Sequence, residues 1–408
     1  MIDIKAARND PESWRAALAR KGAAEEFDAL LEADRARRSL LPQVEGLKAR
    51  QKLKGKPTPE QLEELQGVKA ELERLEAELR AAEARYDELL ARVPNPPDPS
   101  APDGFTEEDA VEIRRAGEAR ELGFEPLDHL AFGGIDMERG AKVSGSRFAY
   151  RVGEAALVEL ALYRFALDRV VAKGFIPVLP PVLVREQAMY GTGFLPTEEV
   201  NIYRIERDDL YLTGTSEVAL AAMHAEEELD AGALPLHYAG YSTCFRREAG
   251  AAGKDTRGMF RVHQFDKVEM FVFCLPEDSP EQHEYLLSVE EELVEELGIP
   301  YRVVNIPAGE LGASASKKYD IEGWFPAQNR YRELTSTSNT TDYQTRRLGV
   351  RFRRDGGRLE PVHTLNGTAV TARFLLAIME NLQVESGTYE VPEVLVKYGA
   401  PRSLPAPA

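Results

Sequence analysis

Residues 62–89 carry the pattern that most restricts how this chain can fold. Apolar side chains recur there at alternating steps of three and four: Leu62, Leu65, Val68, Leu72, Leu75, Leu79, Ala82, Tyr86 and Leu89. This heptad seam predicts a coiled-coil helix, because only a helix brings residues at this spacing onto one face. At about 1.5 Å per residue, the helix that carries the seam would be about 50 Å long, which exceeds the width of a small domain. We therefore expect it to project as part of an arm.

The preceding residues predict a second helix that pairs with the first. A weaker seam runs through residues 27–52, with Phe27, Leu31, Leu41, Val44 and Leu47. The sequence GKPTPE at residues 55–60 supplies a helix stop, a turn and a restart at proline. Two helices joined by so short a turn must run antiparallel. Pro42 and Gly46 lie inside the first helix and should weaken or kink it.

Charge is distributed unevenly along the chain. The whole chain has 51 basic and 69 acidic residues, and its net charge of -18 argues against a general polyanion binder. Residues 1–92 are nearly neutral, with 18 Lys or Arg and 19 Asp or Glu. Within them, residues 35–56 hold eight basic residues and a single acid, Glu45. This basic stripe is either a solvated helix face or a surface that contacts phosphates.

The segment PNPPDPSAPD at residues 94–103 predicts a stiff boundary between two domains. We expect an N-terminal helical arm over residues 1–92, a Pro-rich linker over 93–103 and a catalytic body over 104–408. Strands are expected near Tyr211 and over residues 238–248, 261–273, 301–306, 319–324, 331–339 and 359–365, and helices over 154–173, 280–297 and 369–383. Strands that follow each other without intervening helices indicate an antiparallel sheet with helices on its faces, which is an α+β body.

The chain has few features of an exported or membrane protein. Its two cysteines, Cys244 and Cys274, offer no disulfide framework and no zinc-ligand spacing, and the six histidines show no metal spacing either. The N-terminus lacks a basic region followed by an apolar run, and no apolar stretch approaches membrane length. These observations predict a cytoplasmic protein without zinc and without a membrane partner.

Residues 245–273 form the most informative stretch of the body. Two β-type runs, 238–248 and 261–273, flank a Gly-rich basic segment at 249–260, which predicts an antiparallel hairpin with a mobile loop. Even spacing puts one set of side chains on a single face of the second run: Arg261, His263, Phe265, Lys267, Glu269 and Phe271. The opposite face, with Val262, Val268, Met270 and Val272, can be buried. A face with cations, a carboxylate and aromatic rings beside a basic loop suits an anionic aromatic ligand such as a nucleotide.

These features occur together with a set of sequence blocks that span nearly the whole chain. The blocks are KGFIPVLPPVL (173–183), TGTSE (213–217), FRREAG followed by RGMFRVHQFDKVEMF (245–271), KKYDIEGW (317–324), RELTSTSNTTDYQTRR (332–347) and TLNGTAVTARFLLAIMENLQ (364–383). In this order, and behind an antiparallel helical arm, they resemble a bacterial-type seryl-tRNA synthetase, a class II aminoacyl-tRNA synthetase. The resemblance implies an antiparallel-sheet class II body with an N-terminal coiled-coil arm.

The resemblance also implies an activity and its partners. Such an enzyme activates L-serine with ATP and Mg²⁺ to seryl-adenylate. It then transfers the seryl group to the 3′ end of serine tRNA and, where the host has one, of selenocysteine tRNA. The family is homodimeric, and the block at residues 173–183, up to Pro181, resembles its dimer-interface element. The arm of the family holds the tRNA outside the anticodon, which would explain the basic stripe.

The family motifs assign roles to the nucleotide side of the site. Arg246 would clamp the α-phosphate and the serine carboxylate, Arg373 would cover the γ-phosphate, and Glu333 would complete this catalytic set. Glu248 is similarly placed to accept from the adenine amino group and Phe265 to stack on the ring, while Glu333 and Ser336 would be ligands of Mg²⁺. The ATP-binding positions implied are Arg246, Arg247, Glu248, Val262, His263, Gln264, Phe265, Glu333, Leu334, Thr335, Ser336 and Arg373.

A second set of positions would recognise serine. Glu269 and Thr368 match the family residues that hold the hydroxyl, which would favour serine over alanine because an unpaired buried acceptor costs about 1–3 kcal/mol. Glu269 could instead make a structural ion pair along its strand. The serine-binding positions implied are Thr215, Ser216, Glu217, Arg246, Glu269 and Thr368.

Two other functions remain open from the residues alone. An amino acid:carrier-protein ligase would share every catalytic residue but would not need the arm. A catalytically silent scaffold would use the coiled coil to bind protein, although the intact set of charged residues argues against it.

Overall fold

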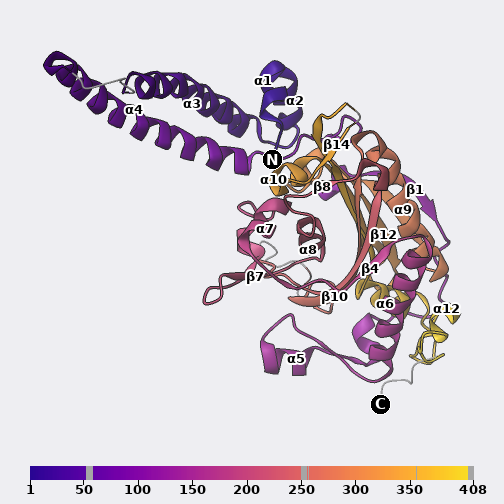
Figure 1. Ribbon diagram of the computed structural model, residues 1–408. Helices are drawn as coiled ribbons and strands as arrows, with labels where there is room; N and C mark the ends of the chain where they lie inside the picture. Colours follow the sequence, from indigo (N-terminus) through magenta and orange to yellow (C-terminus); the bar gives the residue numbers. More distant parts are fainter. Residues whose placement is uncertain (52–57, 250–254, 256, 355, 403–408) are drawn as a thin grey trace. The chain divides into compact units, whose positions relative to one another are not determined.

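The computed structural model describes residues 1–51, 58–249, 255, 257–354 and 356–402. The chain divides into two compact units, Met1–Pro96 and Pro97–Ala408. Each unit has its own secondary structure and its own buried residues (Figure 1). Among the described helices, none combines the length and the apolar content that a bilayer span requires.

The first unit is entirely helical. Its helices are α1 (Ile4–Asn9), α2 (Pro11–Ala19), α3 (Ala24–Gln51) and α4 (Pro59–Arg92). Asp3 and Asp10 cap the first two helices, because their side chains accept hydrogen bonds from backbone N–H groups of the first turn. These two short helices lack a seam and were not predicted.

Helices α3 and α4 form the predicted antiparallel pair. Arg50 near the end of α3 bonds Glu64 near the start of α4, whereas Arg37, earlier in α3, lies over the ring of Tyr86, late in α4. Five residues of the α4 seam are buried: Val68, Leu72, Leu75, Tyr86 and Leu89. Val44 packs with Leu72 and Leu75 in an apolar cluster between the helices. The heptad prediction is therefore confirmed. Residues 55–57 of the predicted turn lie outside the described residues, and α4 begins at Pro59, as the restart at proline predicted.

Pro42 does not end α3. The helix runs without interruption from Ala24 to Gln51 through both Pro42 and Gly46. A proline removes one backbone hydrogen bond from a helix interior. Here the packing of Val44 and Leu47 against α4 supplies tertiary contacts immediately beyond the proline. The expected weak point is therefore a lost hydrogen bond inside a continuous helix.

The second unit is built on an eight-stranded sheet of order β1-β11-β12-β13-β16-β10-β9-β4. Its strands are β1 (Val111–Ala116), β4 (Ile176–Val178), β9 (Leu236–Phe245), β10 (Gln264–Cys274), β11 (Tyr301–Asn305), β12 (Lys317–Phe325), β13 (Arg330–Thr341) and β16 (His363–Thr371). Every neighbouring pair is antiparallel except β4 and β9. The predicted α+β fold is confirmed.

Shorter elements surround this sheet. Three small sheets contain β2 (Ile135–Asp136) with β3 (Tyr150–Arg151), β5 (Leu183–Val184) with β6 (Tyr203–Ile205) and β7 (Leu210–Leu212), and β8 (Glu228–Leu229) with β14 (Arg351–Arg353) and β15 (Leu359–Pro361). The helices are α5 (Met137–Ser144), α6 (Glu154–Ala172), α7 (Glu186–Thr192), α8 (Glu217–Ala222), α9 (Ser279–Glu296), α10 (Tyr343–Leu348), α11 (Arg373–Asn381) and α12 (Glu393–Val396).

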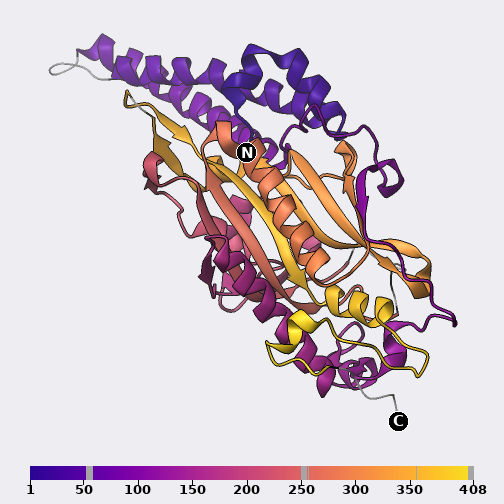
Figure 2. The same ribbon diagram turned by 90° about the vertical axis from the view of Figure 1, so that its right-hand side faces the viewer.

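The main core lies between the large sheet and helices α6, α9 and α11. Leu162 of α6, Leu286 of α9 and Leu376 of α11 are fully buried there together with Val268 and Met270 of β10. Helices α6 and α9 cover this face, and α7 and α8 lie on the other (Figures 1 and 2). The sheet is therefore enclosed on one face and leaves room for a site on the other.

Two predicted elements differ most from the structure at their boundaries. Residues 359–365 are not one strand, because Leu359–Pro361 pairs with β14 whereas His363 begins β16 of the large sheet. The last predicted helix begins at Arg373 rather than at Ala369, since the Thr and Val residues before it extend β16 to Thr371. The Pro-rich segment also packs on the second unit: the Asp98 N–H donates to the Ser316 carbonyl at 2.8 Å, and Ala101 joins an apolar cluster.

Candidate active site

The sheet face that carries α7 and α8 contains an open cavity of about 430 Å³. Arg246, Glu269 and Arg373, which are separated by up to 127 residues in the sequence, all line it. The other predicted site residues in the lining are Thr215, Glu217, Glu248, Val262, Phe265, Glu333, Leu334, Ser336 and Thr368. One cavity therefore brings together most of the predicted nucleotide and serine positions.

The hairpin supplies the floor of the cavity. Strands β9 and β10 pair antiparallel from Phe245 opposite Gln264 to Leu236 opposite Phe273. Phe265, Lys267 and Glu269 face the cavity, whereas Val268 and Met270 are fully buried in the main core. The predicted hairpin is confirmed, and its second strand is two-faced from Phe265 to Met270, whereas Arg261 and His263 precede β10, which begins at Gln264. Residues 250–254 and 256 of the predicted loop lie outside the described residues.

A β-bulge in β13 places two more predicted residues on the cavity face. The pairing of β13 with β12 shifts between Glu333 and Thr335, so that Leu334 is an extra residue. In a regular strand Glu333 and Ser336 would point to opposite faces. With the bulge, both line the cavity, and Leu334 joins the main core. Thr335 also turns to the core side, where its hydroxyl donates to Glu290 Oε2 of α9 at 2.8 Å.

The neighbouring strand β16 also contains a β-bulge. Its pairing with β10 shifts after Thr368, which lies opposite Glu269, and Ala369 is the extra residue before Val370. Ala369 and Val370 are buried in the main core, and Thr368 and Thr371 both line the cavity. The strand thereby presents side chains three residues apart on one face. Its last residues lead directly into Arg373, the first residue of α11.

Cations gather at one end of the cavity. The Arg246 Nε donates to the Gly214 carbonyl at 3.1 Å, and the guanidinium lies 5.3 Å from the ring centre of Phe265. Arg373 Nη1 lies 3.2 Å from Glu333 Oε1 and donates to the Glu333 carbonyl at 2.9 Å. Burial alone would raise the pKa of Glu333, but Arg373 and Lys318 lower it to about 2. This end can neutralise a polyphosphate and keeps one carboxylate ionised.

Glu248 lies beside the aromatic part of this region. It has a left-handed backbone with φ of 51°, which is uncommon for a side chain other than Gly or Asn. Its Oε2 accepts from Arg261 Nη1 at 2.6 Å. Both residues line the cavity together with Phe265. The arrangement offers a flat ring and a carboxylate to a ligand at the open side.

The buried end of the cavity is acidic. Glu269 is 2 % exposed and forms an ion pair with Lys267, which is also buried. Burial raises the pKa of Glu269, and Lys267 opposes that shift. The Thr368 hydroxyl donates to Glu269 Oε2 over 3.5 Å. Glu269 therefore does form the ion pair along its strand that was the alternative to hydroxyl recognition, but this pair lies in the cavity lining.

Glu217 is a second buried acid at this end. Its Oε1 accepts from Gln344 Nε2 at 2.7 Å and from Asn366 Nδ2 at 3.0 Å. Burial, followed by the nearby charge of Glu269, raises the pKa of Glu217 to about 7. Glu217 therefore changes its charge near neutral pH, unlike an ordinary carboxyl group.

Five predicted positions lie outside the cavity lining: Ser216, Arg247, His263, Gln264 and Thr335. The Ser216 hydroxyl donates to the carbonyl of Gly240, a residue of β9, at 3.3 Å. The backbone N–H of Arg247 donates to the Asn201 carbonyl, and His263 Nδ1 donates to the Arg246 carbonyl at 2.9 Å. Gln264 lines a separate hollow with Asp266. These contacts support the cavity walls.

The cavity lining also contains polar residues to which the sequence analysis assigned no role: Glu198, Asn201, Arg261, Lys267, Ser314, Lys318, Ser338, Asn366 and Thr371. Lys267 belongs to the evenly spaced face of β10, so the strand pattern could have identified it. Lys318 and Asn366 lie inside sequence blocks already singled out. Glu198 and Asn201 come from an irregular segment for which no periodic signal exists.

Comparisons with known proteins give a consistent family. Residues 1–97 match the family described as "Seryl-tRNA synthetase N-terminal domain", and residues 201–382 match "tRNA synthetase class II core domain (G, H, P, S and T)". The serine–tRNA ligase of Thermobifida fusca is 48% identical over 97% of this chain and 96% of its own length. That of Nocardia farcinica is 46% identical over the full length of both chains.

Solved structures agree with the sequence comparisons. A crystal structure of seryl-tRNA synthetase from Pyrococcus horikoshii complexed with ATP superposes with a TM-score of 0.93, at 43% identity and full coverage of both chains. The cytoplasmic serine–tRNA ligase of Naegleria fowleri, in complex with AMP, gives 0.87 at 35% identity, over 98% of this chain and 96% of that one. By its sequence, its arm and its catalytic sheet, this chain belongs to the seryl-tRNA synthetase family.

Proposed function

We propose that this protein activates L-serine with ATP and transfers the seryl group to the 3′ end of serine tRNA and, where the host has one, of selenocysteine tRNA. The observation that carries the proposal is the convergence of Arg246, Glu269 and Arg373 on one cavity. Cations at one end match a polyphosphate, and a buried acid at the other matches a small hydroxyl-bearing substrate. The relatives named as serine–tRNA ligases, and the solved relative complexed with ATP, support both substrates.

In the first step, a serine carboxylate oxygen attacks the α-phosphorus of ATP, the bond to the β-phosphate oxygen breaks, and pyrophosphate leaves. Arg246 holds the two anions together and stabilises the charge that develops between them, because its planar fork can bind both. Arg373 orients the γ-phosphate. In the second step, the terminal ribose 3′-hydroxyl attacks the carbonyl carbon of seryl-adenylate, and AMP leaves. Positioning and electrostatics suffice without a covalent enzyme intermediate.

Serine is recognised at the buried end. Glu269 accepts from the serine hydroxyl with Thr368 beside it, while Glu217 and Thr215 face the α-ammonium. Alanine would leave Glu269 without its hydroxyl partner in a buried place, which disfavours it. Ser216 would act indirectly, because its hydrogen bond to the Gly240 carbonyl of β9 supports the wall of the cavity.

The nucleotide lies against Phe265, with Glu248 accepting from the adenine amino group. Glu333 and Ser336 fit Mg²⁺, because the β13 bulge puts a carboxylate and a hydroxyl on one face and oxygen donors are what this ion prefers. The depressed pKa of Glu333 keeps that ligand ionised at neutral pH. When bound, Mg²⁺ would neutralise phosphate charge. We propose no zinc, since Cys244 and Cys274 are both buried free thiols.

The α3–α4 pair is proposed to hold the tRNA. Its basic stripe is partly neutralised within the arm, because Lys48 pairs with Glu76 at 2.8 Å and Arg50 with Glu64 at 2.8 Å. Arg35 and Arg38 stay largely exposed. Lys52, Lys54 and Lys56 lie outside the described residues. The stripe can exchange these surface ion pairs for phosphates at little cost, because such pairs stabilise a protein only weakly.

We further propose a homodimer in the cytoplasm. Apolar side chains are exposed together on α6 and around the edge strand β4: Leu160 is 59% and Leu179 is 81% exposed. An exposed apolar surface at a sheet edge is a typical interface between copies of one chain. A molecular mass of about twice 45.4 kDa in solution supports this proposal, and a monomeric mass contradicts it.

Serine-dependent exchange of pyrophosphate into ATP tests the first step, and charging of serine tRNA tests the second. Both should occur. Exchange without charging of tRNA would instead favour a ligase that loads another carrier. A folded protein without exchange would be a scaffold.

A further inference from the structure

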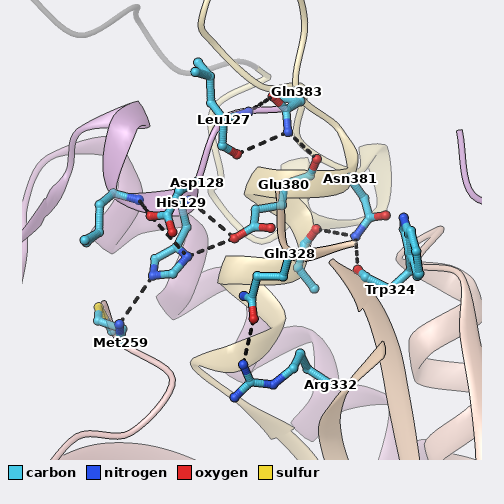
Figure 3. Close-up of polar contacts among 12 residues, drawn as sticks. Leu127, Asp128, His129, Met259, Trp324, Gln328, Arg332, Glu380, Asn381 and Gln383 are labelled. Carbon is cyan, nitrogen blue, oxygen red and sulfur yellow. Dashed lines mark hydrogen bonds and ion pairs between the residues drawn. The ribbon is translucent and has the colours of Figure 1, made fainter. Parts of the chain in front are cut away.

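Helix α11 contacts the same short stretch of chain at both of its ends. At its first residue, Arg373 Nε donates to the Phe260 carbonyl at 3.3 Å. Two turns later, Glu380 Oε1 lies 2.9 Å from His129 Nδ1, and His129 in turn contacts Met259 (Figure 3). Met259 and Phe260 are therefore held directly by one end of α11 and indirectly by the other.

His129 is the centre of the indirect contact. It is 1% exposed, and its Nε2 accepts the backbone N–H of Met259 at 3.4 Å. Its ring meets the edge of the Phe260 ring at 5.3 Å between centroids. Asp128 Oδ1 is 3.7 Å from Nδ1, and Glu380, which is fully buried, is the nearer carboxylate. The imidazole thus joins α11 to Met259 and Phe260, the last two residues of the predicted loop 249–260.

These contacts define which nitrogen of the His129 ring carries the proton. A backbone N–H can only donate, so Nε2 must be the unprotonated nitrogen. The proton then lies on Nδ1, from which it is donated to Glu380, as a carboxylate commonly fixes the tautomer of a histidine. A cation bound by Asp128, His129 and Glu380 would move the proton to Nε2, where it would meet the Met259 N–H. The geometry therefore favours a hydrogen-bonded pair over a metal site.

The neighbouring chain leaves little freedom for another arrangement. Gly258 has φ of 78°, and a Cβ there would lie 2.3 Å from His129 Nε2. On the far side, Phe260 packs edge-on against Phe325 at 4.8 Å. Arg332 lies 4.3 Å over the ring of Phe260 and bonds Gln328 Oε1 at 2.7 Å (Figure 3). The stretch 258–260 is thus fixed from two sides.

This stretch leads directly into the cavity wall. Met259, Phe260, Arg261 and Val262 all line the cavity, and Arg261 pairs with Glu248, the proposed partner of adenine. A displacement of Met259 would move all of these residues. We propose that His129 and Glu380 form a clasp on the Met259 N–H that positions the ATP-binding wall of the site. Neither residue touches substrate, and the inference rests on the proposed ATP-dependent activation.

Pyrophosphate exchange kinetics of the full-length enzyme test the clasp. In His129→Asn, the amide replaces the Nδ1 side of the ring but cannot reach Met259, so the KM for ATP should rise about three- to tenfold while the KM for serine stays within about twofold. In His129→Gln, the longer side chain places an acceptor near the Nε2 position, and the KM for ATP should largely recover. Glu380→Gln keeps the shape but no longer fixes the tautomer, and should raise the KM for ATP about threefold.

His224 provides a matched control. It also joins a carboxylate to a second group, with Nδ1 2.7 Å from Glu227 and Nε2 2.9 Å from the Tyr238 hydroxyl, but it lies outside the cavity lining. His224→Asn should leave both KM values unchanged. If His129→Asn does not fold, the isosteric Glu380→Gln decides alone.

The possible failures are distinguishable. If the unmodified protein shows no exchange, the proposed function fails. If it is active but the KM for ATP is unchanged in His129→Asn and Glu380→Gln, the clasp alone is overturned. Equal rises in both KM values would assign these residues a purely structural role and would also overturn it.

Discussion

The α3–α4 pair and the cavity face of the sheet are both long elements, but they are determined in different ways. In the pair, the buried seam residues follow from the spacing of their neighbours along one helix, and the ion pairs that join α3 to α4, Lys48 with Glu76 and Arg50 with Glu64, are partly exposed. On the cavity face, two bulges change the spacing, and Glu217, Lys267 and Glu269 are buried. Local periodicity produces a scaffold, whereas departures from periodicity produce a site for chemistry.

The strongest test of this difference removes the cation from the cavity. Arg246→Ala should lower serine-dependent pyrophosphate exchange by about 1,000-fold or more, since a preorganised charge at the reacting phosphate is lost. The midpoint of thermal unfolding should change little, because the Arg246 side chain is exposed. Arg353→Ala, which breaks an exposed pair with Glu228, is the control. Exchange that survives in Arg246→Ala would remove this residue from catalysis.

The reverse test weakens the scaffold. Leu72 is 7% exposed and packs on Val44, so Leu72→Ala should destabilise the helix pair by about 2–4 kcal/mol. Helical circular dichroism on heating would detect this change. Exchange should persist, because the cavity residues belong to Pro97–Ala408, while tRNA charging should fall. Lys69→Ala, on the exposed side of α4, should alter neither activity. A loss of exchange in Leu72→Ala would show that the two regions are not independent.

A third test concerns the buried acid. Glu269→Ala should reduce the preference for serine over alanine, measured as the ratio of kcat/KM values in exchange, by about 10- to 100-fold. Glu269→Gln keeps the size of the side chain and an acceptor oxygen, and should retain more of the preference. An unchanged ratio in Glu269→Ala would assign hydroxyl recognition to another residue.

The smallest expected effect is a pH dependence. Burial raises the pKa of Glu217 to about 7. The ionised form attracts the serine ammonium, so the KM for serine should fall about tenfold between pH 6 and pH 8. The contribution of Glu217 to the folding stability changes in the other direction. Because its pKa is raised in the folded state, this contribution is fully present below the ordinary carboxyl pKa and is lost as pH rises through about 7. Glu217→Gln should flatten both profiles, and a profile that persists in this variant would exclude Glu217 as its source.

The same contrast explains what the sequence could predict. The α4 seam predicts five of the buried residues of that helix, because a helix repeats the same geometry at every turn. On β10, period-2 spacing correctly separates Glu269 from Met270. The motifs placed both Glu333 and Ser336 in the site, but regular alternation would have put them on opposite faces. Only the pairing of β13 with β12 reveals Leu334 as the extra residue.

Other site features also depend on contacts between distant segments. The family motif implied that Thr335 binds ATP, but the bulge turns its side chain toward Glu290. Burial raises the pKa of Glu290 well above its ordinary value. Nothing within ten residues of Glu290 signals this role, because its partner comes from another strand.

The two bulges make strand length as important as residue type. Leu334 and Ala369 are ordinary apolar residues, and a conservative replacement at either would alter only local packing. Insertion of one more residue beside either would instead turn the remainder of its strand over, so that a carboxylate or a threonine of the site would face the apolar interior. Deletion of Leu334 or Ala369 itself would remove the bulge and leave the site residues on its two sides two positions apart, on the same face of the sheet. We therefore expect insertions in these two strands to be tolerated far less than substitutions.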